Sequence, residues 1–173
     1  MGKQKTNRQS SRVFSDTEVD IALDNWERQH GTNKTYSTNT VGVYGELSVY
    51  RTLIRQGYAS KIYKPISDEN HVDLVVETNQ HKFDRVQIKT ITKMNSATSI
   101  EVKMGKYIKS NRVDVVAVYF APKDAVAFVP YKNTHSITLA LTTAKNNQGN
   151  RNWFWQYERY PEFSGGHITD DIQ

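Results

Sequence analysis

The chain has 173 residues, enough for one domain with its own core, and its 37% hydrophobic and 24% charged residues fit a soluble globular protein. It contains no cysteine, which excludes disulfides, thiolate catalysis and cysteine zinc sites and favours a reducing, cytoplasmic location. The net charge of +5 favours a nucleic acid over an acidic protein as partner, and no apolar run fits a signal peptide or a membrane span.

The first segment is basic. Residues 1–14 are interpreted as a flexible arm whose candidate nucleic-acid contacts are Lys3, Lys5, Arg8 and Arg12. Residues 15–40 are predicted to form a helix followed by a polar linker, because Ser15 and Glu18 make a capping-box pattern and Gly31 is a plausible stop.

A second helix is predicted over residues 41–58, ending at Gly57. Its apolar side chains recur along one stripe, through Val43, Leu47, Tyr50 and Ile54.

After this helix the apolar period changes to that of strands. Strands are predicted at residues 60–65, 71–77, 82–92, 99–104, 113–120, 125–131 and 135–141. Short polar links at 78–81 and 121–124 suit hairpins, and residues 105–112 are predicted as a short helix. This order indicates an α/β fold with a mixed central sheet flanked by helices.

The stretch "RVQIKT" places polar side chains in a strand that is otherwise apolar. Gln87 and Lys89 face the same way because side chains alternate along a strand, and Asp73 opens the strand before them. Buried polar groups need partners. A carboxylate and an amide oxygen suit Mg²⁺, with Mn²⁺ as a substitute, and an ammonium can balance the charge of a phosphate. Glu46, on the second helix, is the candidate fourth member of this site.

Together these residues resemble the PD-(D/E)XK superfamily of nucleases, which has the restriction-endonuclease-like fold. The helix with Glu46, the strand with Asp73, the hairpin and then Gln87-x-Lys89 follow the superfamily's order, most closely that of a group with glutamine at the second ligand position. The resemblance implies metal ligands at Asp73, Gln87 and Glu46 and a catalytic Lys89. It implies a nuclease core at 41–131, with 132–173 as an extension that packs on the core or an oligomer interface.

The resemblance further implies an Mg²⁺-dependent endonuclease acting on double-stranded DNA in a homing, restriction-like or recombination role. Cutting both strands needs two sites, so a homodimer or homotetramer is expected. A junction resolvase is an alternative, as is a non-catalytic DNA-binding module on a decayed nuclease fold, because Gln87 either ligates metal or marks weakened catalysis.

Several other side chains have an interpretation of their own. Asp114 is expected to pair with a neighbouring donor, His71 to have a surface role, and the aromatic residues 153–157 to pack in the core or an interface rather than stack on bases. A recurring row of cations is either a surface that follows the DNA backbone or a solvated face: Lys103, Lys106, Lys109 and Arg112.

Overall fold

The computed structural model describes residues 38–66, 71–107, 112–143 and 150–161, with single helical positions at 17, 21, 25 and 28. The basic arm with Lys3, Lys5, Arg8 and Arg12, and also Lys109, lie outside the described residues. Among the described residues, no helix combines the length and hydropathy that crossing a bilayer requires.

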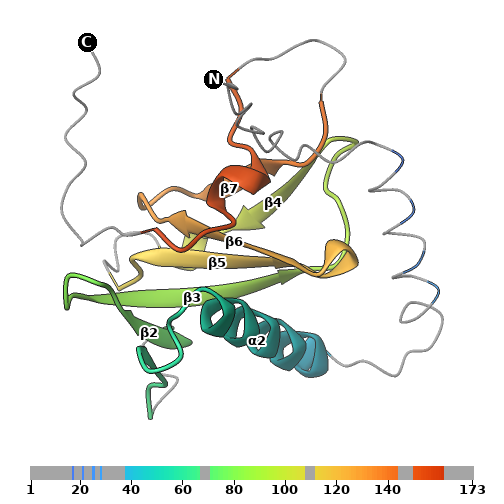
Figure 1. Cartoon of the computed structure of the whole chain (residues 1–173). Coiled ribbons are helices and arrows are strands. Elements are labelled where there is room, and N and C mark those ends of the chain that lie inside the picture. Colours follow the sequence, from blue (N-terminus) through green and yellow to red (C-terminus); the bar gives the residue numbers. More distant parts are fainter. Residues whose placement is uncertain are drawn as a thin grey trace, which may run out of the picture.

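The centre of the molecule is a five-stranded sheet of order β1-β2-β3-β5-β6 (Figure 1). β3 and β5 are parallel and the other neighbours are antiparallel, so the predicted α/β class with a mixed central sheet is confirmed. The strands of this sheet are β1 (Ile62–Tyr63), β2 (Leu74–Glu77), β3 (Phe83–Ile91), β5 (Val115–Phe120) and β6 (Ala125–Pro130). Both predicted hairpins are confirmed, β2 with β3 and β5 with β6.

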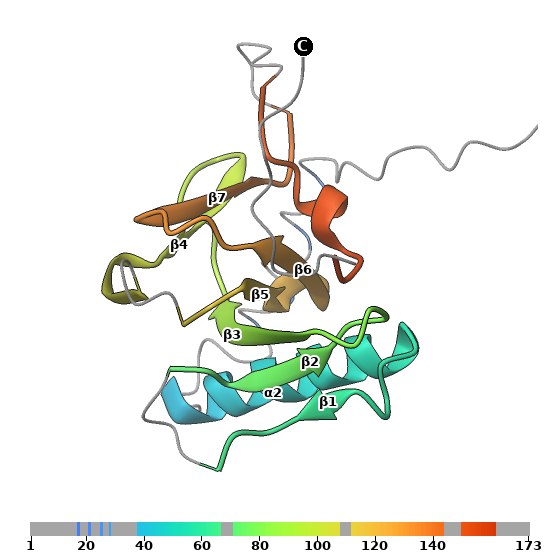
Figure 2. The ribbon, with the colours of Figure 1, turned by 90° about the vertical axis from the view of Figure 1, so that its left-hand side faces the viewer.

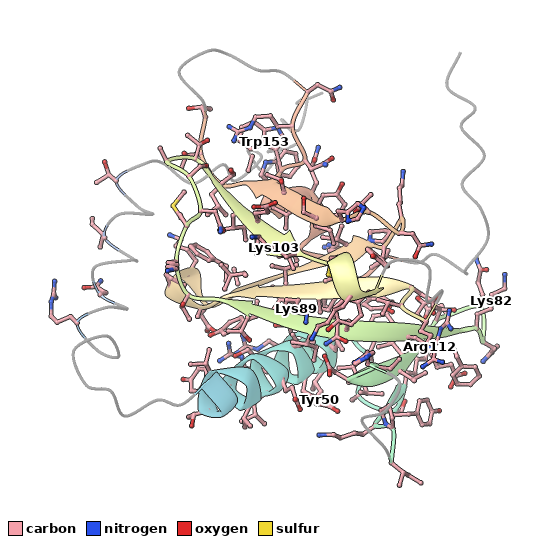
Figure 3. The ribbon with its side chains drawn as sticks, turned by 180° about the vertical axis from the view of Figure 1, so that it is seen from behind. Tyr50, Lys82, Lys89, Lys103, Arg112 and Trp153 are labelled. Atoms are coloured by element: carbon pink, nitrogen blue, oxygen red, sulfur yellow. The ribbon has the colours of Figure 1, made fainter. Side chains whose placement is uncertain are left out.

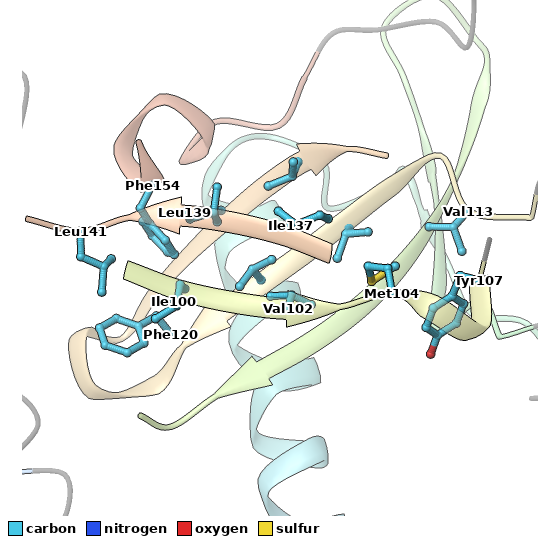
Figure 4. Close-up of a cluster of buried hydrophobic side chains, with 14 residues drawn as sticks. Ile100, Val102, Met104, Tyr107, Val113, Phe120, Ile137, Leu139, Leu141 and Phe154 are labelled. Atoms are coloured by element: carbon cyan, nitrogen blue, oxygen red, sulfur yellow. The ribbon is translucent and has the colours of Figure 1, made fainter. Parts of the chain in front are cut away.

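Different elements cover the two faces of this sheet (Figure 2). Helix α2 (Thr38–Arg55) covers one face, and a ribbon of β4 (Ser99–Lys103) and β7 (Ser136–Ala140) covers the other. Each face therefore has its own buried cluster, and Figure 4 shows the cluster between sheet and ribbon. The short helix predicted at 105–112 is described only at Gly105–Tyr107, as a single 3₁₀ turn, η2.

The alternation of β3 assigns its side chains to the two faces. Val86 and Ile88 belong to the buried cluster on the α2 side. Gln87 and Lys89 therefore point to the opposite side of the strand, as their spacing predicts.

The apolar stripe predicted for α2, which includes Val43 and Leu47, is not the face that the helix buries. Val49 and Leu53 are fully buried against the sheet, whereas Val43 and Leu47 are 55% and 62% exposed. The reason is the small residue at Gly45, which allows the helix backbone to approach β3 more closely than a larger side chain would permit. The buried face is therefore the one that carries Gly45, Val49 and Leu53, each four residues apart.

The close approach at Gly45 leads to a stability prediction. A β-carbon at Gly45 would lie 1.8 Å from Thr90 Oγ1 and 3.2 Å from Thr90 Cβ, whereas one at Gly42 would meet nothing within 4 Å. Gly45→Ala should lower the free energy of unfolding by about 1–3 kcal/mol through overpacking, partly offset by helix propensity. Gly42→Ala, three residues earlier on the same helix, should raise it by up to about 1 kcal/mol.

Urea unfolding of both variants measures this difference. Adding Thr90→Ala to Gly45→Ala should recover most of the stability, since it removes the clashing group. Equal stability of the two glycine variants would show that α2 is not held against β3 at this point.

The described part of the C-terminal segment joins the two buried clusters. Phe154 lies in the cluster on the ribbon side and Tyr160 in the cluster on the α2 side, so the chain passes around the edge of the sheet beside β6. Gln56, just after α2, holds this segment through both ends of its amide. Its Nε2 donates to the carbonyl of Glu158 and its Oε1 accepts from the backbone N–H of Tyr160, each at 2.8 Å.

Tyr160 also reaches a buried acid. Its hydroxyl donates to Asp84 Oδ2 at 3.0 Å, and Asp84 is only 3% exposed. Burial raises the pKa of Asp84 to about 6; the Tyr160 hydrogen bond opposes the shift and Asp114 adds to it. Because the folded pKa lies above the unfolded one, the folded state binds this proton more tightly. Stability from Asp84 is therefore present in acid and is lost as the pH rises from about 4 to about 6.

Asp84→Asn should remove this pH dependence, because asparagine keeps an acceptor for Tyr160 and carries no charge. At pH 7 the variant should be more stable than the parent by up to about 3 kcal/mol, at ~1.4 kcal/mol per pKa unit. Unfolding free energies measured between pH 4 and 7 test this. The same pH slope in both proteins would rule out Asp84 as its origin.

Candidate active site

Asp73 stands directly before β2 and is bound to β3. Its backbone N–H donates to the carbonyl of Val86 at 2.9 Å, and its Oδ2 accepts hydrogen bonds from the Ile88 backbone N–H and from Gln87 Nε2. The antiparallel register that pairs Leu74 with Val86 produces this meeting, because the residues one step outward then face each other. The hairpin thus brings together Asp73 and Gln87, as their positions in the sequence predict.

Gln87 is only 6% exposed, and its two amide atoms differ in their surroundings. Nε2 donates to Asp73 and, at 3.2 Å, to the carbonyl of Ile88. Oε1 is buried and has no hydrogen-bond partner within the part of the chain that the structure describes. A buried acceptor without a partner costs about 1–3 kcal/mol. The position therefore holds an oxygen that can still accept a donor or a cation.

Lys89 follows on the same face of β3 and is held by a residue that sequence reasoning missed. Its ammonium donates to the hydroxyl of Tyr107 at 2.7 Å and lies 4.7 Å from the centroid of that ring. Tyr107 belongs to the stretch 105–112, for which the sequence predicts a short helix and a row of cations but no role for the tyrosine. No spacing pattern predicts that Tyr107 contacts β3, because the fold of the chain from β3 through β4 to β5 brings Tyr107 there.

Glu46 lies on α2, where its carboxylate accepts a hydrogen bond from Lys64 Nζ at 3.3 Å. Tyr50 follows Glu46 one turn later on α2. The charges of Glu46 and of the hairpin residue Asp73 both act on its hydroxyl. Burial raises the pKa of Tyr50, Lys64 opposes the shift, and the carboxylates of Glu46 and Asp73 both add to it. Both carboxylates therefore act on one hydroxyl. Lys64, another cation at the site, was also missed, since no motif distinguishes it from other lysines.

Asp114 has the structural pairing that was predicted. Its carboxylate accepts three hydrogen bonds from Arg85, one from the backbone N–H and two from the guanidinium, at 2.8–2.9 Å. Burial alone would raise the pKa of Asp114, but the Arg85 hydrogen bonds outweigh it and lower the pKa below its ordinary value. This pair joins the start of β5 to β3 and has no part in a metal site.

The described members of the basic row are exposed. Lys103 ends β4, Lys106 lies on η2 with its Nζ 5.7 Å from the Tyr107 ring centroid, and Arg112 precedes β5. In the view of Figure 3, Lys89 is seen between Lys103 on the ribbon side and Tyr50 on the helix side, and Arg112 is seen toward Lys82. The exposed His71 places its ring edge-to-face against Tyr107, with centroids 5.6 Å apart.

Comparison with known proteins identifies the family. The profile of the PD-(D/E)XK endonucleases matches residues 36–160. The chain belongs to this family. Its structure is similar to that of a bacterial homing endonuclease, I-Ssp6803I, with a TM-score of 0.51 and 16% identity over 70% of this chain and 86% of that one. At this identity the likeness shows the fold alone. A comparison with curated proteins gives no match.

Membership of the PD-(D/E)XK endonucleases supports a nuclease, a class of hydrolase whose members typically use divalent metals. The residues present fit such an ion. Within the described ranges, no cluster of three or more His, Cys, Asp or Glu side chains could hold a metal. Mg²⁺, however, usually takes only one or two carboxylates, with waters and substrate phosphate completing its shell. The Asp73 carboxylate and the buried Oε1 of Gln87 are hard oxygen donors of that kind.

Proposed function

We propose that this protein is an Mg²⁺-dependent endonuclease that hydrolyses phosphodiester bonds in double-stranded DNA. The observation that carries the proposal is the Gln87 amide, whose Nε2 donates to Asp73 while its buried Oε1 has no partner among the described residues, with Lys89 on the same face of the strand. An amide that served only as strand packing would be expected to have both of its polar atoms satisfied.

The side chains of the site would have distinct roles. Asp73 and Gln87 would hold the cation. Glu46 would become a third oxygen donor when its hydrogen bond with Lys64 breaks. A bound Mg²⁺, or Mn²⁺ in its place, would polarise the scissile phosphate and lower the pKa of a water. The Lys89 ammonium would stabilise the negative charge that develops on the phosphate oxygens and orient the attacking water.

Cleaving both strands requires two such sites, so we propose a homodimer or homotetramer. The exposed Lys103, Lys106 and Arg112 would contact phosphates near the site, and the basic arm would add contacts of its own. The role in the cell would be homing, restriction-like cleavage or recombination.

The decisive experiment is incubation of the purified protein with plasmid and with branched DNA, with and without Mg²⁺, beside Asp73→Ala. Cleavage of plasmid that needs both Mg²⁺ and Asp73 supports the proposal. Cleavage confined to branched DNA would instead indicate a junction resolvase. Cleavage that persists in Asp73→Ala would show that the catalytic site lies elsewhere.

One observation favours a second function, that of a non-catalytic DNA-binding module. Gln87 Nε2 donates to Asp73, so the amide already satisfies the carboxylate without a cation. That function predicts DNA binding with no cleavage in Mg²⁺ or Mn²⁺, and no effect of Asp73→Ala on affinity.

The proposed phosphate contacts predict a change in salt dependence. Lys103→Ala and Lys106→Ala should each weaken DNA binding uniformly across sequences and reduce the slope of log affinity against log salt by about 0.9 for each phosphate that is no longer neutralised. Fluorescence anisotropy titrations at several salt concentrations measure the slope. Lys123→Ala, in the turn between β5 and β6, removes one charge in the same way and should leave the slope unchanged. An unaltered slope in all three variants would show that this row is a solvated face.

A further inference from the structure

Tyr107 lies at the boundary between the buried cluster and the candidate active site. It is 3% exposed, and its ring belongs to the cluster between sheet and ribbon. Figure 4 shows this ring near Met104 at one end of the cluster, with the hydroxyl pointing outward. That hydroxyl is the acceptor for Lys89 Nζ at 2.7 Å. The ring alone would suffice for packing, so the hydroxyl has a role that packing does not explain.

The contact restrains a side chain that is otherwise flexible. Lysine has four rotatable side-chain bonds, and holding its ammonium in one place costs up to about 2 kcal/mol of rotamer entropy. The hydrogen bond to the Tyr107 hydroxyl gives the ammonium of Lys89 a preferred position, with Nζ 4.7 Å from the ring centroid.

The same ring contacts the segment that leads into β2, the other strand of the hairpin. His71, two residues before Asp73, packs edge-to-face on it with an interplanar angle of 86°. Tyr107 therefore touches the chain just ahead of Asp73 and the side chain of Lys89. A rigid, buried ring in contact with both is placed to fix the distance between the carboxylate and the ammonium.

We propose that Tyr107 is a positioning residue that holds the Lys89 ammonium in its working place beside Asp73 and Gln87. The proposal rests on the proposed function, because positioning matters to the rate only if Lys89 stabilises charge during phosphodiester hydrolysis. It concerns a residue that acts through Lys89 and does not itself touch the reacting phosphate.

The test is Tyr107→Phe, which keeps the buried ring and removes only the acceptor. We expect kcat to fall about 10- to 100-fold, the range found for outer partners of functional groups, with KM for DNA unchanged. In a Lys89→Met background the same change should have no further effect. Tyr157→Phe is the matched control, because it removes a hydroxyl that donates to Asn152 Oδ1 at 3.4 Å in the C-terminal segment, and it should leave kcat unchanged.

A second measurement does not depend on activity. NMR relaxation of the Lys89 ¹³Cε methylene group should show a rigid side chain in the parent and a markedly more mobile one in Tyr107→Phe. If the parent protein does not cleave DNA, the proposed function fails, and this measurement still decides whether Tyr107 holds Lys89. Unchanged Lys89 mobility, an unchanged or raised kcat, or an additive effect in the Lys89→Met background would each overturn the proposal.

Discussion

Replacing Lys89 with methionine is expected to reduce DNA cleavage by about two to three orders of magnitude, the usual cost of removing one group that stabilises transition-state charge. Methionine keeps much of the length and apolar stem of lysine, so the fold should survive. Binding of DNA should also persist, because the exposed cations that would contact phosphates lie elsewhere. Single-turnover cleavage rates and anisotropy titrations separate the two properties.

A suitable control for the removed charge is Lys93→Met, at an exposed position just beyond the end of β3. It should cleave at nearly the parent rate. Asp73→Asn should lose cleavage like Lys89→Met, but for another reason, since it weakens the cation site, and metal titration should distinguish the two. Normal cleavage by either active-site variant in Mg²⁺ would refute the site assignment.

Two substitutions of Gln87 should have opposite effects on metal binding. Gln87→Leu removes the buried Oε1, so affinity for Mg²⁺ or Mn²⁺ and the cleavage rate should fall together, each by about 10- to 100-fold. Gln87→Glu keeps an oxygen and adds negative charge near Asp73, so the cation should bind at least as tightly and measurable cleavage should remain.

Calorimetric titration of the divalent ion, with cleavage measured across the same concentrations, checks both variants. If Gln87 only bridged strand neighbours, the order would reverse, because leucine suits this buried face and an added carboxylate does not. An active Gln87→Leu protein would end the metal-ligand hypothesis.

Much of the fold could be predicted because its strongest signals are local. The alternation around Gln87 and Lys89 correctly predicts which side chains share a face, and the short links at 78–81 and 121–124 correctly predict hairpins. For α2, the apolar stripe through Val43 and Leu47 predicts the wrong buried face. The close approach of Gly45 to Thr90 depends on a contact between residues far apart in the chain, and no periodicity encodes it.

The candidate site also has a part that the sequence predicts and a part that it does not. The meeting of Asp73 and Gln87, and the shared face of Gln87 and Lys89, could be predicted because one hairpin carries all three residues. Tyr107 and Lys64 could not. Each reaches the site through a tertiary path, one by way of the ribbon strand β4 and the other from beyond the end of α2.

The passage of residues 154–160 around β6 has a consequence for folding during synthesis. Phe154 completes one buried cluster and Tyr160 completes the other. The side chain of Gln56 can form its two hydrogen bonds only after Glu158 and Tyr160 have been synthesised. A nascent chain that ends before residue 154 leaves an edge strand uncovered and both clusters incomplete, and exposed edges invite pairing between chains. Docking of residues 154–160, rather than formation of the sheet, should therefore be the step that covers this edge strand and lowers the tendency to aggregate.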